Sequence, residues 1–130
     1  MAKVIGVMGE SGAGKTTAMQ NLDPSVTYYF DCDKKGLNWR GWRKQYNKEN
    51  RNYCKTDDKD AVMLALSKLN CDDGTYAVYR KKLGLEPKMI TPEEKEWSMR
   101  FKTVVIDTLN GIMVADEVER MKEKSYDKWV

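Results

Sequence analysis

The feature that most constrains the fold of this chain is a glycine-rich segment near its N-terminus. Residues 9–16 read GESGAGKT and match the phosphate-binding loop pattern G-x-x-x-x-G-K-[ST]. Residues 3–8 before it form a short apolar run rich in β-branched side chains, which predicts a buried strand. Residues 17–22 after it can continue as a helix as far as Pro24. This order of strand, loop and helix is typical of an α/β fold, with a parallel sheet flanked by helices.

The residue types in this loop suit a bound polyphosphate. Glycine has no Cβ and tolerates positive φ, so Gly9, Gly12 and Gly14 let backbone N–H groups approach phosphate oxygens closely. Lys15 can reach the β- and γ-phosphates, and Thr16 offers its hydroxyl to Mg²⁺. A glycine-rich turn that matches by chance is the alternative, which the flanking strand and helix disfavour. We therefore expect ATP and Mg²⁺ as cofactors, bound by Gly9, Glu10, Ser11, Gly12, Ala13, Gly14, Lys15, Thr16 and Thr17.

Two further predicted strands end in aspartates. Residues 26–30, VTYYF, lead into Asp31 and Asp33, and residues 102–110 contain an apolar run that ends at Asp107. Ligands of open α/β sheets bind at the carboxyl ends of the strands, so we expect these carboxylates on the same edge as the loop. Asp107 has the form of a Walker B carboxylate, which holds Mg²⁺ through its water shell. Asp31 is either functional or a cap of the next turn.

The most basic stretch is residues 34–55, which carry eight lysines and arginines and one glutamate. If residues 37–46 are helical, Trp39, Trp42 and Tyr46 lie on one face. Basic charge interleaved with aromatic rings is typical of single-stranded nucleic-acid binding, so single-stranded DNA is a candidate partner. The alternative is that the aromatic face packs on the sheet and the charges form a solvated outer face. The candidate DNA contacts are Trp39, Arg40, Arg43 and Lys44.

The remaining segments are predicted to be mostly helical. Residues 52–54 predict a short strand, and residues 58–70 predict a helix with one apolar face. Residues 71–100 predict a helical insertion, which is either a lid or a partner surface. Its last helix starts at a capping box in residues 91–94, and a final helix is expected over residues 114–129.

Length and composition bound the class of protein. The 130 residues suffice for one nucleotide-binding domain, and a net charge of +3 does not by itself indicate nucleic acid. No signal peptide and no apolar run of membrane-spanning length is found, so we expect no membrane partner and a cytoplasmic location. Cys32, Cys54 and Cys71 show no C-x-x-C spacing and the chain has no histidine, which disfavours a structural zinc site.

Three phrases of the sequence resemble a known group of proteins. The phrases are MGESGAGKTT, DCDKKGLNWRGWRKQYNKEN and VVIDTLNGIMVADE, which cover about a third of the chain. Together they resemble the RecA-like branch of P-loop ATPases, in particular the ATP-binding proteins of tailed bacteriophages related to single-strand annealing proteins. The resemblance implies ATP hydrolysis in phage DNA recombination or replication, in the host cytoplasm. It assigns Asp33 as the general base, Lys15 and Thr16 as phosphate and Mg²⁺ contacts, and Asp107 as the carboxylate beside the metal.

The sequence departs from that pattern at its C-terminal end. RecA-like folds place a later strand between the phosphate-loop strand and the Walker B strand, and no strand candidate follows Asn110. We therefore expect the N-terminal part of such a fold, incomplete at the C-terminus, that self-associates or takes a strand from a partner. One alternative is a nucleotide-binding module without turnover. Another is a P-loop small-molecule kinase, whose Walker B strand lies directly beside the phosphate-loop strand, with residues 80–82 contacting phosphate.

Overall fold

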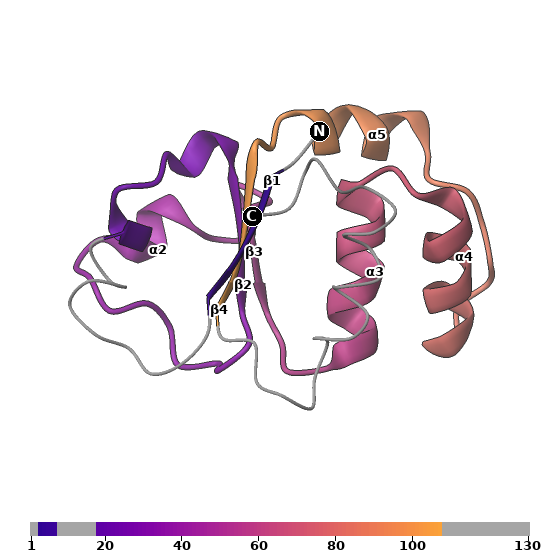
Figure 1. Cartoon of the computed structure of the whole chain (residues 1–130), viewed down its shortest axis with the longest axis horizontal. Coiled ribbons are helices and arrows are strands. Elements are labelled where there is room, and N and C mark those ends of the chain that lie inside the picture. The colour runs from indigo at the N-terminus through magenta and orange to yellow at the C-terminus, as the bar shows by residue number, and fades with distance from the viewer. Residues whose placement is uncertain (1–2, 8–17, 108–130) are drawn as a thin grey trace.

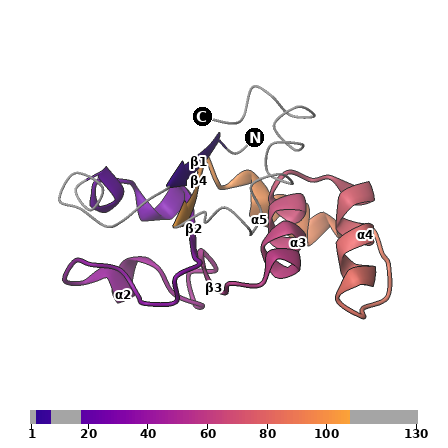
Figure 2. The ribbon, with the colours of Figure 1, turned by 60° about the horizontal axis from the view of Figure 1, so that its bottom comes forward.

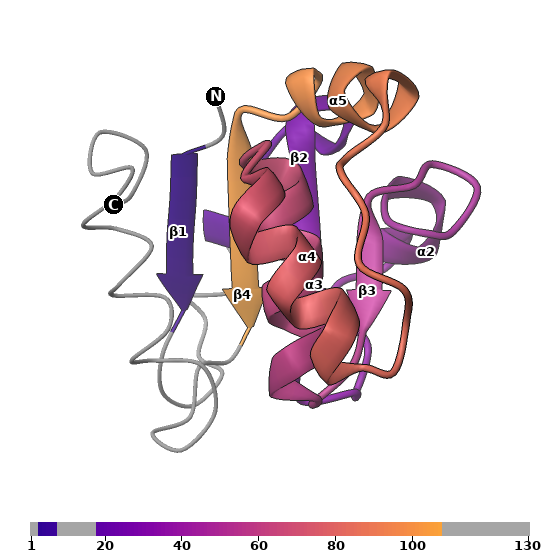
Figure 3. The ribbon, with the colours of Figure 1, turned by 90° about the vertical axis from the view of Figure 1, so that its right-hand side faces the viewer.

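The computed structural model describes residues 3–7 and 18–107. Four parallel strands form one sheet in the order β1-β4-β2-β3, which Figure 3 shows nearly face-on. The strands are β1 (Lys3–Val7), β2 (Thr27–Asp31), β3 (Tyr53–Lys55) and β4 (Thr103–Asp107). The predicted α/β class with a parallel sheet and flanking helices is therefore confirmed.

Helices cover both faces of this sheet (Figure 1). On one side α3 packs against the sheet, α4 lies on the outer side of α3, and α5 crosses the amino-terminal end of the strands (Figures 1 and 3). The other side carries the short α2 and helical residues 18–20. The elements are the 3₁₀ helix η1 (Pro24–Val26), α2 (Trp42–Gln45), α3 (Lys59–Leu69), α4 (Asp73–Lys82) and α5 (Pro92–Met99). No helix among the described residues has the length and apolar character needed to cross a membrane.

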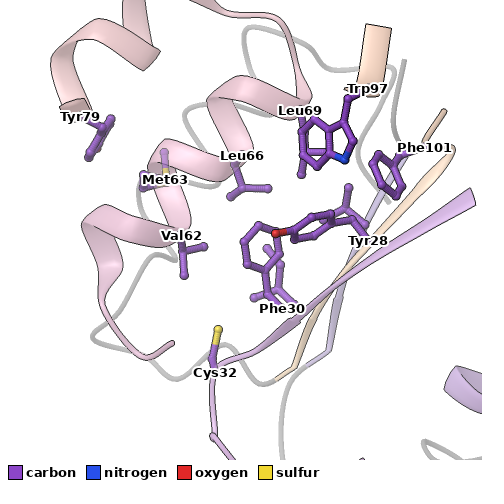
Figure 4. Packing of buried hydrophobic residues seen from close by; sticks show 12 residues of the cluster. Tyr28, Phe30, Cys32, Val62, Met63, Leu66, Leu69, Tyr79, Trp97 and Phe101 are labelled. Atoms are coloured by element: carbon purple, nitrogen blue, oxygen red, sulfur yellow. The ribbon is translucent and has the colours of Figure 1, made fainter. Parts of the chain in front are cut away.

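The side chains of β2 alternate between two hydrophobic clusters, as strand geometry requires. Tyr28 and Phe30 face the α3 side, where they pack with α3, α5 and β4 residues (Figure 4). Tyr29 faces the opposite side and packs there with Val105 of β4 and with Met19. The odd-numbered residues of β2 and β4 therefore lie on the same face of the sheet as Tyr29. This face includes Asp31 and Asp107.

The helix starts follow local capping chemistry. The Asp58 carboxylate accepts the backbone N–H groups of the first turn of α3, and Asp72 does the same for α4. At α5, the Thr91 side chain accepts the Glu94 N–H while the Glu94 side chain accepts the Thr91 N–H, which confirms the predicted capping box.

The predicted gap between the phosphate-loop strand and the Walker B strand is wrong. β4 pairs directly with β1 over five residue pairs, from Lys3–Thr103 to Val7–Asp107, and with β2 on its other edge. Both edges of β4 thus have their backbone N–H and C=O groups paired, without a further strand between β1 and β4. The expectation of self-association or a borrowed strand loses its basis, and the order is the one given above for P-loop kinases.

The segment around α2 differs from the predicted helix over residues 37–46. Only Trp42–Gln45 is helical, because Gly41 adopts a left-handed φ of 87° and stops the helix from extending backwards. The irregular loop still buries Trp39 and Tyr46, which pack on Tyr29 with ring centroids 6.4 and 5.2 Å away. A base-stacking role for Trp39 is therefore wrong, since its side chain is only 8% exposed and belongs to the core.

Candidate functional site

The carboxylates predicted at the strand ends meet at one edge of the sheet. Asp31 and Asp107 are register partners at the ends of β2 and β4, and Val7 at the end of β1 is paired with Asp107 from the other side. Parallel strands place their carboxyl ends on a common edge, and the odd numbering of both aspartates places them on one face. The edge therefore combines two carboxylates with the point where the chain enters the phosphate-loop sequence.

Asp107 is held by a buried tyrosine. The Tyr29 hydroxyl donates a hydrogen bond of 2.6 Å to Asp107 Oδ2. Burial raises the pKa of the Tyr29 phenol, and the hydrogen bond to Asp107 raises that pKa further, so the hydroxyl stays protonated and donates. The Asp107 carbonyl also accepts the Cys32 N–H at 2.6 Å. Both the backbone and the side chain of Asp107 are thus fixed before any ligand binds.

Asp31 organises the turn that follows β2. Its side chain is buried and accepts the Lys34 and Gly36 N–H groups at 2.9 Å and the Tyr53 hydroxyl at 2.6 Å. Lys34 and Gly36 both adopt a left-handed backbone, with φ of 60° and 78°, and the hydrogen bonds of their N–H groups to Asp31 link this turn to the end of β2. Of the two roles left open by the sequence, the geometry favours the turn cap for Asp31.

Asp33 lies within this turn, and its side chain is exposed. It shares a small pocket with Tyr29, Asp31 and Asp107, whose remaining lining includes Met19, Lys35 and Trp39. The turn therefore presents Asp33 to solvent on the same face as Asp107. An exposed carboxylate in this place can approach a ligand, whereas the carboxylate of Asp31 is occupied by the turn.

The predicted phosphate loop, residues 9–16 with Lys15 and Thr16, lies outside the described residues, and so does the predicted helix over residues 114–129. The structure describes the chain on both sides of the loop. Val7 is paired with Asp107, and Met19 lines the same pocket as Asp107 and packs with Tyr29. The described residues just before and just after the predicted loop therefore both lie near Asp107.

Asp107 is the described carboxylate predicted to lie beside a metal ion at this edge. Among the described residues, no group of three or more His, Cys, Asp or Glu side chains is arranged to hold a metal ion. Asp107 is half-buried and fixed by Tyr29, which suits a carboxylate that holds Mg²⁺ through water. Thr16 is the predicted source of the direct hydroxyl ligand.

Sequence reasoning missed the hydroxyls of Tyr29 and Tyr53, because it treats residues 26–30 and 52–54 only as strand-forming segments. Tyr29 supports Asp107 and Tyr53 supports Asp31, each through a 2.6 Å hydrogen bond. The period of two would have placed Tyr29 on the face of Asp31. Its bond to Asp107 needed the pairing of β2 with β4, which local sequence does not specify.

The stability of the fold should fall as the pH rises above about 10, the ordinary tyrosine pKa. The unfolded chain releases the Tyr29 proton there, whereas the raised pKa in the folded state retains it, so folding is penalised at high pH. Thermal melts of wild type and Tyr29→Phe between about pH 9 and 11 measure this. The variant should show the shallower loss of melting temperature with pH, and equal slopes would contradict the assignment.

Comparison with known proteins gives no match: no family model, no curated protein and no solved structure is significantly similar to this chain. What the protein does is therefore inferred from the loop sequence and from the carboxylates and hydroxyls at this edge.

Proposed function

We propose that this protein binds Mg²⁺–ATP at the carboxyl edge of its sheet and hydrolyses it. The observation that carries the proposal is the register of β1 and β4. It sets Asp107 beside Val7, and the sequence GESGAGKT begins two residues after Val7. A phosphate loop and a metal-side carboxylate at the same carboxyl edge of a parallel sheet are what P-loop nucleotide chemistry needs.

Each part of the site has a separate task in this proposal. The loop N–H groups and Lys15 bind the phosphates, and Thr16 and Asp107 hold the metal, with Asp107 oriented by Tyr29. When bound, Mg²⁺ supplies a positive charge that neutralises the charge developing on the phosphate oxygens. Asp33, exposed on the turn that Asp31 organises, orients the attacking water and accepts its proton.

A small-molecule kinase is the second candidate, because β4 pairs directly with β1 as in the kinase-type order. The position of residues 71–100 does not support the role of a lid that a kinase would give them. α4 lies on the outer side of α3, away from the sheet (Figure 1), and the Arg80 guanidinium donates to the Glu86 carbonyl. The two candidates differ in a simple assay, since an ATPase releases phosphate from ATP in water alone and a kinase needs an acceptor.

Lys15→Ala should weaken Mg²⁺–ATP binding at least about tenfold, because a lysine facing polyphosphate contributes about 1.5–3 kcal/mol. Isothermal titration calorimetry with the full chain measures this, and Lys81→Ala, an exposed lysine on α4, is the matched control. Equal affinities for wild type and Lys15→Ala would refute the phosphate-loop assignment. Loss of affinity in both variants would point to a general charge effect instead.

The three sequence phrases that resemble phage ATP-binding proteins support a role in DNA recombination or replication as part of this proposal, whereas the strand order differs from that of RecA-like folds. Adding single-stranded DNA to the phosphate-release assay tests that part separately. A DNA-independent rate would leave ATP hydrolysis in place and remove the recombination role.

A further inference from the structure

A groove beside strand β3 combines aromatic rings with exposed positive charge. It lies between α2 and β3, which Figures 2 and 3 show next to each other. Its volume of about 610 Å³ falls in the range of small-molecule pockets, about 300–1,000 Å³. Trp42 and Tyr53 contribute the rings, and Arg43, Lys48 and Lys55 contribute the cations. No carboxylate lines it.

Among the described residues, the three cations have no acidic partner. Arg43, Lys48 and Lys55 are exposed, and in the part of the chain that the structure describes no ion pair joins any of them to a carboxylate. Neighbouring cations that are not neutralised repel one another and attract polyanions. Their arrangement around one groove therefore favours a ligand with several negative charges along its length.

The two rings of the groove differ from the buried aromatics next to them. Trp39 and Tyr46 are almost fully buried, and of these two only Tyr46 lines the groove. Trp42 and Tyr53, which also line it, are half-buried. The Trp42 and Tyr53 centroids lie 5.4 Å apart, and the Arg43 guanidinium lies over the Trp42 ring at 5.2 Å. Partly open rings beside cations are the combination that stacks nucleobases and neutralises phosphates.

Both rings are anchored before any ligand arrives. The Tyr53 hydroxyl donates to Asp31 at 2.6 Å. The Trp42 ring packs so closely on Gly36 that a Cβ added there would lie 2.9 Å from Trp42 Cζ2. Rings held in this way lose little conformational entropy on binding, which increases the affinity available from stacking.

We propose that this groove binds single-stranded nucleic acid, with bases stacked on Trp42 and Tyr53 and phosphates on Arg43, Lys48 and Lys55. The site is distinct from the proposed nucleotide edge and does not depend on ATP binding. Of the contacts expected from sequence, this site keeps only Arg43, because Trp39 is buried and Arg40 and Lys44 do not line the groove. The residues that it adds are Trp42, Lys48, Tyr53 and Lys55.

Fluorescence anisotropy with a labelled oligothymidylate and the full chain, without nucleotide, tests the proposal. The triple variant Arg43→Gln/Lys48→Gln/Lys55→Gln should flatten the log–log salt dependence of affinity by about 2, from roughly 0.7 per phosphate contact. Trp42→Ala should weaken binding about 5- to 150-fold, and Trp42→Phe, which keeps a ring, should restore most of it. Thermal melts identify any variant that fails to fold, and the triple variant changes only exposed side chains.

The matched control is Lys81→Gln/Lys82→Gln/Lys102→Gln, which removes the same charge from exposed sites outside the groove. It should leave the salt dependence unchanged. Equal flattening in both triple variants, or no binding by wild type, would overturn the proposal. A polyglutamate peptide that competes as well as unlabelled oligothymidylate would also overturn it, because such a peptide brings charge without bases and would identify an acidic protein segment as the occupant.

Discussion

Replacing Asp33 with Asn is expected to lower ATP turnover by about 10²–10⁴-fold, the usual effect of losing a general base. The expectation rests on the proposed hydrolysis and on the position of Asp33. Its side chain is exposed on the turn after β2 and shares a pocket with Asp107. Asn keeps the size of the side chain but cannot accept a proton from water. Because Asp33 is exposed, the variant should fold as stably as wild type and bind Mg²⁺–ATP equally well.

Phosphate release under single-turnover conditions, together with calorimetric binding, separates these effects. Asp57→Asn is the matched control, since Asp57 is an exposed aspartate whose partner, Lys34, lies 3.7 Å away on the surface. Unchanged turnover in Asp33→Asn would remove Asp33 from the mechanism. If wild type binds ATP without releasing phosphate, the protein is a binding module or a kinase lacking its acceptor.

Asp31→Ala is expected to destabilise the fold by about 3–5 kcal/mol, because three hydrogen-bond donors lose a charged acceptor. The variant leaves the Lys34 and Gly36 N–H groups and the Tyr53 hydroxyl without their acceptor in a place where the Asp31 side chain is 1% exposed. Each buried donor left without a partner costs about 1–3 kcal/mol.

Urea unfolding of wild type and Asp31→Ala at neutral pH measures this difference. Asp57→Ala serves as control and should stay within about 0.5 kcal/mol of wild type, because exposed ion pairs contribute little. A loss below about 1 kcal/mol for Asp31→Ala would mean that the turn closes without its cap. That result would reopen a functional role for Asp31.

Local sequence was sufficient to predict three of the strands, the start of α5 and the carboxylates at the carboxyl edge of the sheet. The β-branched and aromatic runs predicted β1, β2 and β4, and the capping box predicted the start of α5, because these signals act over a few residues. The position of Asp107 at the end of an apolar run was enough to place it at the carboxyl edge.

The roles of neighbouring residues needed the tertiary structure. Asp31 and Asp33 are two residues apart in sequence, yet one is buried under three hydrogen bonds and the other is exposed. Trp39 and Trp42 are three apart, yet the left-handed Gly41 between them sends one into the core and leaves the other at the groove. Whether each of these residues is buried or exposed depends on contacts with side chains and backbone groups of elements that are distant in the sequence.

By itself, then, the sequence determined the α/β class, the strand faces, the phosphate-loop motif and the carboxylates at the strand ends. Only the tertiary structure decided that β4 lies between β1 and β2, that Tyr29 holds Asp107, and that Tyr53 holds Asp31. The physical reason is that strand periodicity specifies which face a side chain takes, whereas strand order is set by pairing between segments far apart in the chain. In this protein β1 and β4 are separated by about a hundred residues, and no local propensity encodes their contact.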